Sequence, residues 1–195
     1  MNNDYVKVYP LDINLEKIRE SCDILNQYIN SNFDQVEGAI ATGPLTTRVF
    51  NHYNLLLFPY DEFHKLYQEI CRVFSIVCNT DKNYYIQCWL NYCTYEQFID
   101  WHSHWGSQDN TWHGFVCVDS EESITSYRLP SGEEFDVPSK NGTLVISKSD
   151  GDVHRTYPWP HVDRPRITIA FDCVPEDRIQ WGVNHWIPVA KLNHL

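Results

Sequence analysis

The sequence predicts an α+β fold in which two N-terminal helices support a jelly-roll core, that is, a double-stranded β-helix. Two observations predict it. Apolar residues recur at helical spacing in the first 82 residues, whereas short runs rich in Tyr, Ile, Val, Trp and Thr, separated by turn-forming residues, follow from residue 83 onward. About seven short strands favour a sandwich or barrel, and helices ahead of them favour packing against one outer face.

Two segments carry the helical pattern. In the first, Asn14 is the expected N-cap of an apolar stripe, and in the second, Asp61 is the expected cap after Pro59. The first stripe consists of Leu15, Ile18, Cys22, Leu25 and Ile29, and the second of Phe63, Leu66, Tyr67, Ile70, Val73 and Phe74. We expect both stripes to be packing faces rather than binding surfaces.

The expected strands lie near residues 84–92, 97–104, 114–118, 125–129, 143–147, 152–155 and 166–173. No repeat or linker rich in Pro and Gly divides the 195 residues, so we expect one domain. It would comprise a helical part at 1–82, a β core at 83–175 and a C-terminal extension at 176–195.

Composition limits the classes of partner. The net charge of −11 makes nucleic acid an unfavourable partner, because binding to phosphates needs a basic face. The chain lacks a long apolar run and a secretory leader, so we expect a cytoplasmic protein that does not bind membranes. Its seven cysteines include no C-x-x-C pair, and we expect them to be reduced and buried. The sequence does not indicate an oligomeric state.

The strongest local feature is the H-x-H pair formed by His102 and His104. Side chains two apart on a strand point to the same face, so the two imidazoles could hold one metal ion together. Imidazole suits iron, zinc, copper and nickel, so the pair alone does not select the metal. Two surface histidines would give the same pattern.

A third imidazole is available from His154. It follows the segment 141–146 at the distance of one strand and a turn, so the fold can bring it to the H-x-H pair from a distant strand. The alternative is a hydrogen-bonded loop histidine without a metal.

Arg166 and Thr168 share one face of the last expected strand. A guanidinium group forks onto a carboxylate with two charge-assisted hydrogen bonds, and a hydroxyl two residues on can bond the same group. The pair therefore suits a dicarboxylate ligand. Arg166 could instead pair with one of the many acidic side chains.

In this order, the three features resemble the Fe(II)/2-oxoglutarate-dependent oxygenases, whose usual pattern is H-x-D/E, a distal His and R-x-S/T. The resemblance covers roughly residues 85–174 and is greatest to small members of prolyl-hydroxylase-like type. It implies that His102 and His154 bind Fe(II), that Arg166 with Thr168 binds 2-oxoglutarate, and that O2 takes an open metal position. The implied enzyme is a dioxygenase that hydroxylates a small-molecule or peptide substrate.

His104 departs from this pattern, because it stands where the family has a carboxylate. A neutral imidazole leaves the metal site one charge unit more positive. His104 could ligate directly, Asp100 could supply the carboxylate, or a water could take the position; we expect direct ligation. Asp100 and Asp152 are then candidates to orient imidazoles from behind, unless they serve only solubility.

Two other functions stay open. A three-histidine dioxygenase of cupin type would use no 2-oxoglutarate, and Arg166 would bind the carboxylate of its substrate. A jelly-roll binding protein without catalysis would hold a structural metal or none. The R-x-T pair at Arg166 and Thr168 argues against the cupin-type dioxygenase, and the presence of all three features in order argues against the binding protein.

Overall fold

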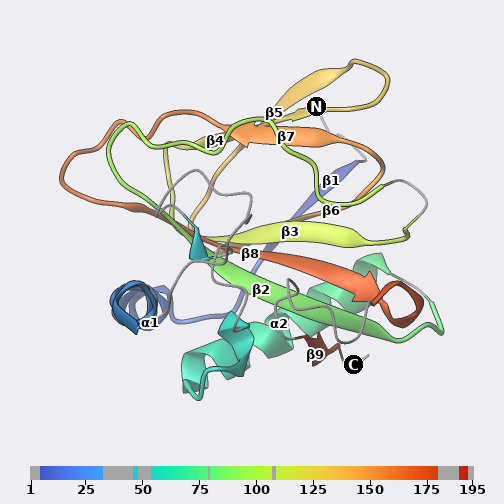
Figure 1. Cartoon of the computed structure of the whole chain (residues 1–195), viewed down its shortest axis with the longest axis horizontal. Helices are drawn as coiled ribbons and strands as arrows, with labels where there is room; N and C mark the ends of the chain where they lie inside the picture. Colours follow the sequence, from blue (N-terminus) through green and yellow to red (C-terminus); the bar gives the residue numbers. More distant parts are fainter. Residues whose placement is uncertain are drawn as a thin grey trace.

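The computed structural model describes residues 5–32, 46–47, 54–78, 80–106, 109–179 and 189–192. The described residues form two antiparallel sheets and two α-helices. Figure 1 shows them as three layers: the smaller sheet, the larger sheet and the helices. The predicted α+β jelly-roll fold is therefore confirmed.

The larger sheet has the strand order β1-β6-β3-β8-β2-β9, and the smaller sheet has the order β5-β4-β7. The strands of the larger sheet are β1 (Val6–Pro10), β2 (Tyr84–Cys93), β3 (Trp112–Asp119), β6 (Thr143–Lys148), β8 (Arg166–Pro175) and β9 (Ala190–Lys191). Those of the smaller sheet are β4 (Ile124–Arg128), β5 (Glu134–Pro138) and β7 (Val153–Thr156).

The helices are α1 (Leu15–Asn32) and α2 (Asp61–Val77). The Asn14 cap is confirmed, because the Asn14 side chain accepts a hydrogen bond of 3.1 Å from the backbone of Lys17. The cap at Asp61 is wrong. Tyr60 is the N-cap and makes no side-chain cap bond, while Asp61 opens the first turn, where a negative charge still favours the helix dipole. No helix in the described part of the chain is long and apolar enough to cross a membrane.

Strand β8 separates the two cores of the protein. Its odd-numbered side chains pack with both helical stripes in the main core beneath the larger sheet, and these include Ile167, Ile169 and Phe171. Ala170, on the opposite face, packs with Trp89 in a smaller core between the sheets. The period of two along β8 therefore directs its even-numbered side chains into the barrel interior.

The predicted strand at 97–104 is wrong. Only His102 forms an isolated bridge there, to His154, and a few backbone hydrogen bonds tie residues 96–99 to the end of β7 and the segment that follows it. Pro158 and Pro160 stand in that partner segment, and a proline has no N–H with which to continue a ladder. Strands β1, β5 and β9 were not predicted.

Candidate metal centre

Three histidines from distant parts of the chain bring their imidazoles together. One ligand atom each of His102, His104 and His154 lies within 4.8 Å of the other two. The backbones of His102 and His154 exchange two hydrogen bonds of 3.1 and 2.9 Å, and directly opposed residues of this kind present their side chains on one face. Their ring centroids are 4.3 Å apart. This isolated bridge, rather than the expected strand at 97–104, therefore positions His102 beside His154.

Asp172, on β8, supports His104 from behind. Its Oδ1 lies 2.7 Å from Nδ1 of His104, and Gln87 donates a hydrogen bond of 3.0 Å to its Oδ2. The Trp89 ring stacks on His104 at 5.7 Å between centroids. Sequence reasoning missed Asp172, although it stands four residues after Thr168 and therefore on the same strand face.

Asp100 does not reach the imidazoles with its carboxylate in this structure. Its Oδ1 accepts a hydrogen bond of 2.7 Å from the backbone N–H of Trp101. Its backbone carbonyl, in contrast, lies 2.8 Å from Nδ1 of His102. This contact orients the His102 ring so that Nε2 is left for a ligand.

Asp152, the other candidate, lies among buried side chains. Its Oδ1 accepts a hydrogen bond of 2.7 Å from the Tyr5 hydroxyl. Its Oδ2 lies 3.3 Å from Nε2 of His113 and 3.8 Å from Nδ1 of His154. His113, on β3, was given no role from the sequence because no motif marks it. It now belongs to the same group of imidazoles, with its ring 4.9 Å from that of His154.

The electrostatics favour the neutral form of His102 and His154 and the charged form of Asp172. Burial, together with the neighbouring His104, lowers the pKa of His102 to about 4, and burial lowers the pKa of His154 well below its usual value. Burial opposes ionisation of Asp172, but the electrostatic interaction and the hydrogen bond with His104 hold the pKa of this carboxyl below its usual range. Neutral imidazoles backed by a carboxylate are good metal donors.

Arg166 and Thr168 are both buried, with 3% and 1% of their surface exposed. The Nε group of Arg166 donates a hydrogen bond of 3.1 Å to the Ser123 hydroxyl, while Nη1 has no hydrogen-bond partner. Thr125, which also faces the interior, has a buried hydroxyl without a partner. Leaving such groups unpaired costs about 1–3 kcal/mol each, and more for a charged one.

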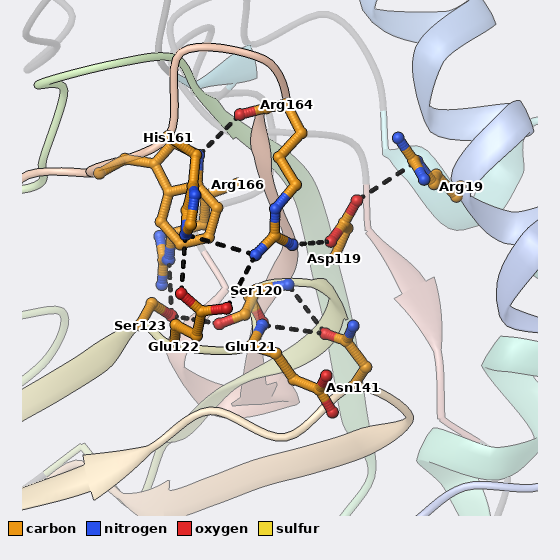
Figure 2. Close-up of polar contacts among 11 residues, drawn as sticks. Arg19, Asp119, Ser120, Glu121, Glu122, Ser123, Asn141, His161, Arg164 and Arg166 are labelled. Carbon is orange, nitrogen blue, oxygen red and sulfur yellow. Dashed lines mark hydrogen bonds and ion pairs between the residues drawn. The ribbon is translucent and has the colours of Figure 1, made fainter.

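The acidic side chains near Arg166 contact other basic side chains. Figure 2 shows Asp119 between Arg164 and Arg19, at 2.9 and 3.4 Å, and Glu122 beside His161 at 2.9 Å. No carboxylate forms an ion pair with Arg166 within the described ranges. The alternative in which Arg166 serves an internal ion pair therefore has no support here.

These residues fit the groups that the resemblance implies. Three imidazole nitrogens lie within 4.8 Å of one another, and such donors suit a first-row divalent ion such as iron. The unpaired guanidinium nitrogen of Arg166 suits an anion with a carboxylate end.

No family model matches the sequence, and no curated protein matches it. Solved structures do match. A prolyl hydroxylase from Trichoplax adhaerens, in complex with a peptide fragment of hypoxia inducible factor, superposes with a TM-score of 0.64 at 10% identity, covering 90% of this chain and 86% of its own. An oxidoreductase of the 2OG-Fe(II) oxygenase family from Burkholderia pseudomallei gives 0.57 at 11%, covering 95% and 90%.

A prolyl-4-hydroxylase from Pseudomonas putida is similar to the same extent, with a TM-score of 0.56 at 11% identity, covering 88% of this chain and 86% of its own. Identity is low throughout, so the likeness concerns the backbone. The chain has the fold of the 2OG-Fe(II) oxygenases and prolyl hydroxylases.

Proposed function

We propose that this protein is an Fe(II)- and 2-oxoglutarate-dependent dioxygenase that hydroxylates a C–H bond of a small-molecule or peptide substrate. The observation that carries the proposal is the guanidinium of Arg166, buried between the sheets with one nitrogen unpaired and no carboxylate partner in the described structure. A buried cation of this kind needs an anion, and a 2-oxoglutarate carboxylate supplies one.

His102, His104 and His154 would hold the iron. His104 is the preferred third ligand because Asp172 engages its Nδ1, which leaves Nε2 for the metal, whereas the Asp100 carboxylate is bonded to backbone. Asp172 also contributes a negative charge to the site. This charge lies behind the His104 ring, whereas the family pattern has a carboxylate at the position of His104 itself. Iron(II) with bound 2-oxoglutarate would supply the chemistry by which O2 oxidises the substrate.

Arg166 would bind the far carboxylate of 2-oxoglutarate, and the Thr168 hydroxyl, two residues on, would share it. The Thr125 hydroxyl on the facing sheet, now without a partner, would complete this anchor. Ala170 lies on the same face of β8, between Thr168 and Asp172. Its small side chain would leave room for the carbon chain of the cofactor between the anchor and the imidazoles.

The proposal is tested by anaerobic titration of the iron(II)-loaded protein with 2-oxoglutarate. Chelation of 2-oxoglutarate by the iron produces a visible charge-transfer band, which we expect in the native chain. In Arg166→Ala, the apparent affinity for 2-oxoglutarate measured from this band should fall at least tenfold. Arg164→Ala is the matched control, because that guanidinium binds Asp119 rather than the interior. It should leave the band unchanged.

A titration in which iron binds and no band appears would contradict the proposal. The three-histidine dioxygenase without 2-oxoglutarate would then be favoured, with Arg166 binding the carboxylate of the substrate itself. If neither iron nor 2-oxoglutarate binds, the jelly-roll binding protein without catalysis remains. Once the band is seen, succinate release in the presence of candidate peptides and small carboxylates identifies the substrate class.

A further inference from the structure

A second group of metal-binding side chains lies next to the three histidines. His113, Asp152 and His154 offer ligand atoms that lie within 4.8 Å of one another, and all three residues are buried. We call them the inner triad. It shares His154 with the group formed by His102 and His104.

The two distances from the Asp152 carboxylate within the inner triad are longer than those of an ordinary hydrogen bond and leave room for a metal ion between the atoms. Oδ2 of Asp152 lies 3.3 Å from Nε2 of His113 and 3.8 Å from Nδ1 of His154, whereas an N–H···O bond spans roughly 2.7–3.2 Å. Two ligands that each lie about 2.1 Å from a tetrahedral ion are about 3.4 Å apart. The 3.3 Å separation is close to this value, and the 3.8 Å separation exceeds it by a few tenths of an ångström.

Two of these ligand atoms are also unpaired. Oδ2 of Asp152 and Nδ1 of His154 have no hydrogen-bond partner, although only 3% and 8% of their residues is exposed. The Tyr5 hydroxyl fixes the other carboxylate oxygen. A buried carboxylate oxygen and an imidazole nitrogen that face each other without a bond carry a desolvation cost that a cation between them would remove.

We propose that the inner triad binds a second divalent first-row cation, of the closed tetrahedral type that zinc prefers. Two imidazoles and one carboxylate provide three ligands, and the Ser147 hydroxyl, 2.9 Å from Nε2 of His113, is near enough to complete the shell. The His154 ring then holds the inner ion through Nδ1 and the outer ion through Nε2. Filling both sites releases the remaining ring proton of His154 to solvent.

The negative charges present make two adjacent ions tolerable. The carboxylate of Asp152 touches the inner site, and that of Asp172 stands behind His104. The deprotonated His154 ring adds a third negative charge between the ions. The inner site does not depend on the proposed oxygenase function, because it needs neither 2-oxoglutarate nor Arg166.

The test is the number of ions that one chain binds. The metal-free protein is loaded with Co(II) or Zn(II), desalted, and measured by elemental analysis, and the visible absorption of the Co(II) form is recorded. We expect two ions in the native chain, one in His113→Asn, and one in the double variant His102→Ala/His104→Ala. The double variant should keep the intense absorption of tetrahedral Co(II), which His113→Asn should lose.

His64→Asn is the matched control, since His64 lies exposed on α2 outside both groups, and it should bind two ions. One ion in both the native chain and His113→Asn, with none in the double variant, would overturn the proposal and make the inner triad a structural support for His154. If His113→Asn does not fold, the double variant still decides the matter. If the native chain binds two ions but shows no 2-oxoglutarate band, the proposed oxygenase function fails and the inner metal site stands.

Discussion

At the scale of single residues, the site depends on side chains that no motif marks. His102, His104 and His154 could be found from spacing, because two residues on an extended chain share a face. The place of His113 in the site and the contact of Asp172 with His104 could not, because both depend on which distant segments of the chain lie side by side, as β8 and β3 do in the larger sheet. Register between distant strands is a tertiary property that a local pattern does not contain.

Asp172→Asn should weaken metal binding without unfolding the protein. The amide keeps the size of the carboxylate, but it removes the charge that lies 2.7 Å from Nδ1 of His104. Removing such a partner of a ligating histidine costs about 10–100-fold in metal affinity. Calorimetric titration with Fe(II) or Co(II) measures the change. Asp177→Asn, an exposed partner of Lys82, is the control; equal affinities in the two variants would exclude the role of Asp172.

At the scale of elements, the strands that the sequence predicted are those buried on both faces or rich in β-branched residues, such as β2, β6 and β8. Strand β5 was missed because its residues alternate between exposed and half-buried and include two acidic side chains and a proline. Pairing with β4, rather than propensity, makes it a strand. Strand β9 has two residues, below the length at which a pattern is visible.

Strand β8 carries both the proposed 2-oxoglutarate anchor at Thr168 and the support of His104 at Asp172. A substitution of Ala170, which lies between them, tests whether the cofactor occupies this face of the strand. We expect Ala170→Leu to abolish the 2-oxoglutarate charge-transfer band while Fe(II) still binds, because the larger side chain would occupy the space between Thr168 and Asp172 and leave all three histidines in place. Overpacking against Trp89 costs about 1–3 kcal/mol of stability, which a denaturant titration will show. Ala170→Gly is the control and should retain the band. A normal band in the leucine variant would place the cofactor elsewhere.

At the scale of the whole molecule, the two helical stripes and the larger sheet bury one continuous core, and the barrel interior carries the polar site. Polar side chains inside a barrel are tolerated because they bond one another: Tyr5 reaches Asp152 from the chain before β1, and Gln87 reaches Asp172 from β2. The site is thus tied to the fold of the whole chain. Its ionisation states then affect the stability of the entire protein.

Acid should therefore unfold the metal-free protein. The pKa of His102 falls from 6.5 to about 4 in the folded state, so between these values the unfolded chain binds a proton that the folded chain does not. Stability is then lost as the pH falls, by about 3 kcal/mol from His102 alone between pH 7 and 4. The lowered pKa of Asp172 acts in the same direction. Chemical denaturation at successive pH values, with a chelator present, measures the loss. His102→Asn should flatten the profile, and an unchanged slope in that variant would show that other groups carry the acid sensitivity.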